Sequence, residues 1–168
     1  AEFGLGIVPW SPLSFGFLSG KYDRAAVEAA APRSAGLPKD AAAAGDQRPE
    51  NDKRLDGANP FGDTLFTERN WKIVEVLKQV AKESGETPAR LALAWVTQRP
   101  GVSSTLMGVS RVAQVAENIA SLELVISAEH RAALDAVSAP DPRMLYTLFT
   151  SAVRQFAVFG GSNVTPWR

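Results

Sequence analysis

The chain has 168 residues, 45% of them hydrophobic, so it is long enough to form one globular domain with a buried core. Its 18 basic and 18 acidic residues balance, and no apolar run approaches the roughly 20 residues of a membrane span, so we expect neither nucleic acid nor a membrane as partner. The absence of cysteine excludes disulfides and thiolate chemistry and fits a reducing compartment, so we expect a cytoplasmic protein.

A short apolar segment, residues 5–10, is expected to form a strand. It leads directly into a loop, residues 11–22, that contains three serines, two glycines and a lysine. Gly16 and Gly20 allow the backbone to approach a ligand, and Lys21 supplies a charge for phosphate. The alternative is a tight loop whose apolar side chains pack beneath the rim of a sheet or barrel. The loop alone supports both interpretations equally.

Residues 23–64 are expected to form a long, flexible loop within the domain, because proline and glycine recur throughout this stretch. Residues 25–31 are compatible with one or two helical turns. Runs of this length inside a compact domain are often lids or binding loops.

Two helices are predicted next. Thr67 is the expected N-cap of the first and Gly85 its stop. The second begins at Thr87-Pro88, is apolar nearly all round over residues 91–96, and should be buried on more than one side. The first helix carries an apolar stripe composed of Ile73, Leu77, Val80 and Ala81, with Trp71 and Val74 beside it.

A strand-to-helix junction is expected at residues 104–118, where an apolar run ends at Gly108 and a helical pattern begins almost at once. The free backbone N–H groups and helix dipole of such a junction can receive an anion. Arg111 adds a planar guanidinium that suits phosphate, and Gln114 and Asn118 share one face of the helix. A capped surface helix explains the same pattern. The residues expected to face inward are Val112, Val115, Ala116 and Ile119.

A further helix is expected from the cap Ser127 through Ser138, with Leu134 and Val137 on its apolar side. His130, the only histidine, is expected to be exposed on the surface rather than catalytic, and we expect no metal site. Residues 144–159 are apolar and compatible with a helix, and residues 160–168 resemble a tail laid over a surface.

The alternation of strands and helices predicts parallel strands with helical crossovers. Two strands are too few for a parallel sheet, which is buried on both faces. The first residues also include no initiator Met. We therefore expect the C-terminal part of a larger α/β protein.

Three separated blocks resemble the aldo-keto reductase superfamily, particularly its bacterial and potassium-channel-β-subunit-like branch. They are residues 7–22, residues 87–96, and Gly108 to Arg111 with the polar residues after it, and the resemblance spans residues 5–138. It implies a (β/α)8 TIM barrel that binds NADPH and reduces aldehydes and ketones by direct hydride transfer. Residues 1–168 would supply strands 7 and 8, their helices and the C-terminal tail of that single barrel.

The resemblance also implies a role for each matching residue in binding the cofactor. Both loops would follow the C-terminal ends of barrel strands, where such barrels place their active sites. The nicotinamide would lie against Trp10, the pyrophosphate along Ser11, Pro12, Leu13, Ser14, Phe15 and Gly16 near Lys21, the 2′-phosphate at Gly108, Ser110 and Arg111, and the adenine and ribose at Gln114, Glu117 and Asn118.

The family's catalytic tetrad of Asp, Tyr, Lys and His has no counterpart in this sequence. Tyr22, Tyr146, Lys21 and His130 do not match it. We therefore expect this segment alone to be inactive, and the intact protein to act on a small-molecule carbonyl substrate. The expected partner is the N-terminal part of the barrel or another copy of the chain. A truncated or split-gene product that acts by association, and a regulatory nucleotide-sensing subunit, remain alternatives.

Overall fold

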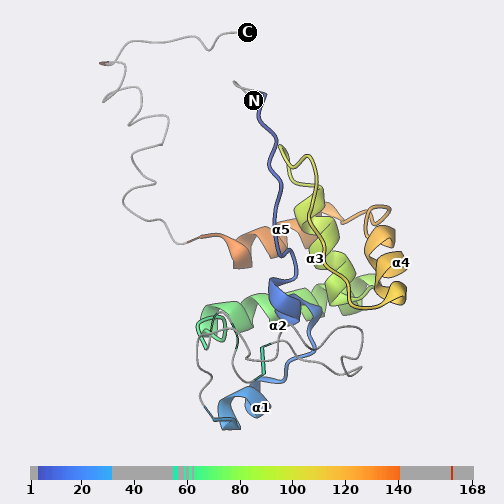
Figure 1. Ribbon diagram of the computed structural model, residues 1–168. Coiled ribbons are helices and arrows are strands. Elements are labelled where there is room, and N and C mark those ends of the chain that lie inside the picture. The colour runs from blue at the N-terminus through green and yellow to red at the C-terminus, as the bar shows by residue number, and fades with distance from the viewer. Residues whose placement is uncertain are drawn as a thin grey trace. The chain divides into compact units, whose positions relative to one another are not determined.

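The computed structural model describes residues 4–31, 55–56, 59, 61, 63–140 and 160. The expectations for residues 144–159, for the tail and for most of the long loop fall outside these residues. Gly6–Val137 form one compact unit, and Ala1–Leu5 with Ser138–Arg168 belong to a second. The helices described are η1 (Ser14–Ser19), α1 (Arg24–Ala29), α2 (Glu68–Ser84), α3 (Pro88–Thr97), α4 (Val112–Ala120) and α5 (Ala128–Ser138) (Figure 1). None of these is long and apolar enough to cross a membrane.

The predicted ends of α2 and the predicted start of α3 are confirmed by their capping groups. The Thr67 hydroxyl accepts a hydrogen bond of 3.2 Å from the backbone N–H three residues on, and Thr87 does the same for α3. Gly85 ends α2 in the left-handed conformation, with φ of 70°. The helical turns expected near residue 25 are present as α1.

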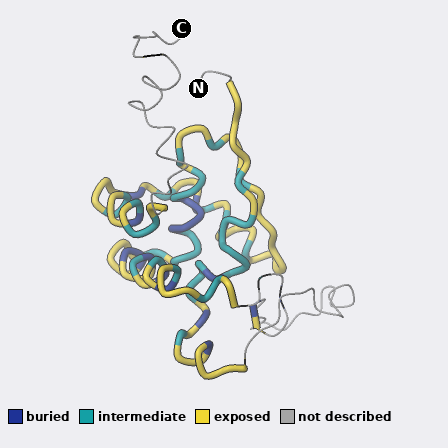
Figure 2. Tube along the Cα trace, turned by 90° about the vertical axis from the view of Figure 1, so that its left-hand side faces the viewer, coloured by how far each residue is buried: buried dark blue, intermediate teal, exposed yellow. Residues whose placement is uncertain are grey.

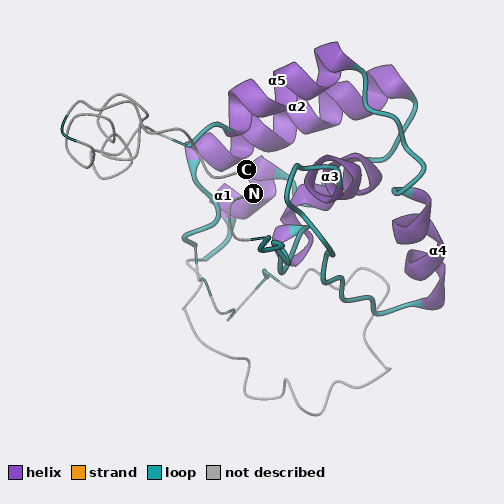
Figure 3. Cartoon of the chain, turned by 90° about the horizontal axis from the view of Figure 1, so that it is seen from above, coloured by secondary structure: helices purple, strands orange, loops and turns teal. Residues whose placement is uncertain are grey.

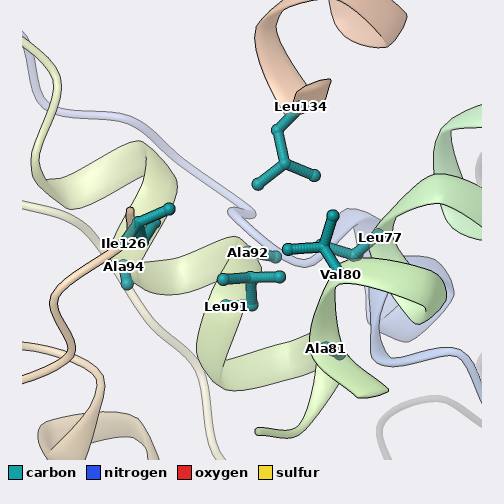
Figure 4. Close-up of a cluster of buried hydrophobic side chains, with 8 residues drawn as sticks. All are labelled: Leu77, Val80, Ala81, Leu91, Ala92, Ala94, Ile126 and Leu134. Carbon is teal, nitrogen blue, oxygen red and sulfur yellow. The ribbon is translucent and has the colours of Figure 1, made fainter. Parts of the chain in front are cut away.

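The main core lies where α2, α3 and α5 meet, and the axes of α2 and α5 run nearly parallel in the view of Figure 3. All four residues from Leu91 to Ala94 are buried, which confirms that α3 is enclosed on more than one side (Figure 2). Its side chains converge with those of the other two helices and of the segment just before α5 (Figure 4). The cluster consists of Leu77, Val80, Ala81, Leu91, Ala92, Ala94, Ile126 and Leu134.

A second cluster lies beneath the loop that contains η1, and it explains a shift in the buried face of α2. Trp71 and Val74 are buried here, whereas Ile73, expected on the stripe, is only half-buried. They pack with Phe17, Tyr22, Val27 and Leu55. Helix α2 therefore contributes side chains to both clusters, and its buried face is wider than the predicted apolar stripe.

The two expected strands are present only as isolated parallel bridges. Ile7 pairs with Val102 and Trp10 with Leu106. The Ile7 N–H donates to the Gly101 carbonyl at 2.8 Å, and the Leu106 N–H to that of Pro9 at 3.0 Å. Pro9 has no N–H to donate, and neither segment has a second neighbour among the described residues, so no continuous ladder forms.

The prediction that the apolar residues of α4 face inward is wrong for the described part of the chain. Val112 is 88% exposed and Ile119 55%, and α4 contains no buried residue. The apolar spacing correctly predicted a helix with one apolar face. That face is not covered by the described residues, among which α3 is the one helix that packs substantially against α4.

His130 is at the surface as expected, but it is half-buried rather than exposed. Its Nε2 lies 3.3 Å from Glu83 Oε2 at the end of α2, and its side chain is only 22% exposed. The cap predicted at Ser127 is confirmed, because its hydroxyl accepts from the His130 N–H at 3.1 Å. Since α5 packs along α2, its first turn lies against the last turn of that helix.

Candidate functional site

A groove of about 900 Å³ opens where the loop after residue 10 meets the start of α4. Its walls come from two segments nearly a hundred residues apart, each following one of the paired extended segments. The groove is lined by Trp10, Ser11, Pro12, Leu13, Phe15, Gly16, Ser19, Lys21, Ala89, Leu93, Leu106, Met107, Gly108, Ser110, Arg111, Gln114, Glu117 and Asn118. The structure thus brings together every predicted cofactor-binding residue except Ser14.

Ser14 does not line the groove. It is the first residue of η1, and its N–H donates to the Ser11 carbonyl at 2.9 Å. Its part in the loop is therefore to close a tight turn beneath the groove wall.

The loop holds an unusual backbone conformation. Ser11, Ser14 and Phe15 have positive φ values of 54°, 47° and 57° although none is a glycine. Such a conformation costs on the order of 1 kcal/mol or more for each residue and persists only where the surroundings fix it. Gly16 follows with φ of 86°, which suits glycine. The backbone of the loop is thus strained, and the surrounding contacts hold it preformed in this conformation.

Gly16 also makes room for Lys21. A Cβ atom at Gly16 would lie 2.9 Å from Cε of Lys21, so the lysine side chain passes directly over the glycine. The Ser19 hydroxyl donates to the Gly16 carbonyl at 2.7 Å and fixes the turn from below. The loop thereby presents a cation at the wall of the groove.

The opposite wall is the N-terminus of α4, where Gln114 folds back on the residues before the helix. Its Oε1 accepts hydrogen bonds from the backbone N–H groups of Ser110 and Arg111, at 2.9 and 3.2 Å, and from the Ser110 hydroxyl at 3.2 Å. This is the N3 half of a capping box. The expected contact of Gln114 with adenine can therefore use only its NH2 group while the cap is in place.

Charge and space in the groove favour an anionic ligand. Lys21 and Arg111 supply cations from opposite walls, and the N-terminal end of the α4 dipole is positive. Among the described residues, no atom would lie within 4 Å of a Cβ at Gly108, which leaves the backbone open to a ligand. Glu117, on the following turn, is an acceptor for sugar hydroxyl or amino groups.

Sequence reasoning missed several lining residues. Ser19, Ala89 and Leu93 line the groove from η1 and α3, and Leu106 and Met107 from the segment before α4. Leu93 belongs to a helix whose apolar pattern indicates only burial. The position of Ser19 between Gly16 and Lys21 could have indicated a groove residue. Whether its side chain reaches the groove, however, depends on how the loop folds.

Comparison with known proteins gives a consistent family match. The model of the Aldo/keto reductase family matches residues 1–139. A probable voltage-gated potassium channel subunit beta from Arabidopsis thaliana is 34% identical over 122 residues, covering 73% of this chain and 31% of that protein. L-glyceraldehyde 3-phosphate reductase from Escherichia coli O157:H7 is 29% identical over 133 residues, covering 79% and 33%. The chain thus spans about a third of the length of the curated relatives it matches.

Proposed function

Since the chain belongs to the aldo/keto reductase family, we propose that it supplies the cofactor-binding part of an NADPH-dependent reductase of aldehydes and ketones. Oxidoreduction of carbonyl compounds is the general chemistry that the family and its reductase-named relatives support. The observation that carries the finer proposal is the groove, because it unites two distant segments whose charges and hydroxyl groups suit a dinucleotide.

The residues present fit such a cofactor. A volume of about 900 Å³ lies within the range of roughly 300–1,000 Å³ that is typical of small-molecule and cofactor sites. Lys21 and the backbone of the preformed loop would hold the pyrophosphate, and Arg111 and Ser110 the 2′-phosphate. Trp10, 70% exposed at the groove, offers an aromatic face for the nicotinamide.

NADPH, when bound, supplies the hydride for carbonyl reduction. The residues of this chain bind and orient it: the ring of Trp10 would cover one face of the nicotinamide, and the α4 terminus would fix the adenosine end. The proton donor to the carbonyl oxygen would come from the family's tetrad, for which we found no counterpart here. We therefore propose that the chain alone has no hydride-transfer activity.

The parallel pairing of residues 7–10 with residues 102–106 supports the proposal that these segments are the seventh and eighth strands of a (β/α)8 barrel. In that fold the loops after neighbouring strands lie together at the C-terminal face. The position of the groove supports this proposal, because both of its loops follow the paired segments. The remaining strands would come from the N-terminal part of the barrel or from another chain.

The test is to titrate NADPH into the protein with a complete barrel, to repeat the titration with this chain alone, and to follow NADPH oxidation with a panel of aldehydes. We expect binding and turnover in the former, and at most weak binding with no turnover in the latter. Failure of the complete barrel to bind NADPH would contradict the proposal.

A second candidate function is nucleotide sensing in a regulatory subunit. It is favoured by the relatives named as potassium channel beta subunits, which are 34% identical to this chain, compared with 29% for L-glyceraldehyde 3-phosphate reductase. NADPH binding by the complete barrel with no turnover of any aldehyde in the panel would support this candidate over the reductase.

A further inference from the structure

Leu55, Asn59 and Phe61 do not line the groove, but as a group they contact the loop of residues 11–22 that does. Leu55 and Asn59 are fully buried, and the Leu55 N–H donates to the Tyr22 hydroxyl at 3.0 Å. Asn59 donates from Nδ2 to the Leu55 carbonyl at 3.1 Å and accepts at Oδ1 from the Phe61 N–H at 3.0 Å. Leu55, Asn59 and Phe61, the brace, are thus linked to one another and to Tyr22.

The brace also reaches the other end of the loop through aromatic contacts. The ring of Phe61 meets that of Phe15 edge to face, with centroids 4.8 Å apart. Phe15 in turn meets Trp10 edge to face at 5.9 Å. Phe15 and Trp10 line the groove, whereas Tyr22 directly follows Lys21. The brace therefore holds the loop at two points, one on each side of Gly16.

The contact with Phe61 is made at a residue of the loop whose backbone is strained. Phe15 is one of the residues with positive φ, a conformation that persists only where surrounding contacts fix it. We propose that the brace keeps the loop in its groove-lining shape, and that Phe61 is a positioning residue that orients Phe15 and, through it, Trp10. The inference rests on the proposed NADPH function, and it adds a residue outside the groove on which cofactor affinity depends.

The test compares four variants of the protein with a complete barrel by their NADPH dissociation constants and melting temperatures. Phe61→Leu removes the ring contact, and Phe61→Tyr retains it. Leu134→Ala is the control, because Leu134 is buried in the cluster of α2, α3 and α5, belongs to neither the loop nor the brace, and does not line the groove. Tyr22→Phe removes the acceptor of the Leu55 N–H and tests the other end of the brace.

We expect Phe61→Leu to raise the NADPH dissociation constant by about two- to tenfold, the range of one edge-to-face contact. Phe61→Tyr should leave the dissociation constant unchanged, and Tyr22→Phe should raise it as Phe61→Leu does. Leu134→Ala should lower the melting temperature without changing the dissociation constant. Unchanged affinity in both Phe61→Leu and Tyr22→Phe would overturn the brace but leave the proposed function standing. No binding by the unaltered protein would overturn both.

Discussion

The side-chain oxygen of Gln114 lies 2.9 Å from the backbone nitrogen of Ser110 and accepts its hydrogen bond. This contact joins the first turn of α4 to the segment that would hold the cofactor's 2′-phosphate. It makes the glutamine both a helix cap and a part of the groove wall. The side-chain oxygen of Gln114 therefore helps to hold this wall of the groove in shape.

Replacing Gln114 with leucine should remove the hydrogen bonds that join the first turn of α4 to Ser110 and Arg111. We expect a stability loss of about 0.5–2 kcal/mol, the usual cost of losing a helix cap, measured by urea denaturation. Gln114→Glu is the matched control, because a carboxylate can accept the same bonds and is favoured at a helix N-terminus. Equal stability of the leucine variant and the unaltered protein would show that the cap contributes nothing.

Arg111 should distinguish the two nicotinamide cofactors. Arg111→Ala should weaken NADPH binding by roughly 1–3 kcal/mol, the scale of a lost charged hydrogen bond, and weaken NADH much less. Fluorescence titration of both cofactors measures the difference, and Arg24→Ala, at an arginine outside the groove, is the control. Equal losses for NADPH and NADH would show that Arg111 does not contact the 2′-phosphate.

Gly6 tests the pairing of the two extended segments. A Cβ atom at this position would lie 1.9 Å from Oγ and 2.9 Å from Cβ of Ser103. Gly6→Ala should therefore destabilise the protein by about 1–3 kcal/mol, as overpacking does. Because Ser103 is the clashing residue, Ser103→Gly in the same protein should recover most of the loss. A double variant no more stable than Gly6→Ala would mean that the segments pair differently.

Asp135 should make the docking of α5 sensitive to acid. Its carboxylate is bound by the Arg99 guanidinium and by Trp95 Nε1, the latter at 2.8 Å, and these bonds hold its pKa below the usual value. A carboxylate whose pKa is lower in the folded than in the unfolded protein stabilises the fold at any pH above its unfolded-state pKa. This stabilisation is lost as the pH falls through the folded-state pKa. Asp135→Asn should therefore lower the melting temperature at neutral pH, and the difference should shrink below about pH 4. A difference independent of pH would exclude the charge as its cause.

The parts predicted from sequence are those with local causes. Thr67, Thr87 and Gly85 mark helix ends through bonds within a few residues, so their roles could be predicted without the fold. The groove residues could be grouped only through the family resemblance, because residues 10–21 and 108–118 carry no local sign of being neighbours. The exposure of His130 and of the apolar face of α4 could not be predicted from local sequence, because burial depends on which element packs against each residue.

The exposed face of α4 provides a test of the proposed barrel. Val112, Val115 and Ile119 form an apolar face with the period of a helix that packs against something, yet Ile119 is 55% exposed in this chain. If the remaining strands and helices of a barrel cover this face, Ile119→Ser should cost about 2–4 kcal/mol in the protein with a complete barrel, as large-to-small changes in a core do. In the chain alone the same change should cost little, because the side chain is already largely in water.

Ala113→Ser, at an exposed position of the same helix, should cost little in both. Urea denaturation of the two proteins gives the comparison, and an equally small effect of Ile119→Ser in both would mean that α4 keeps its apolar face in solvent and that the barrel closes in some other way.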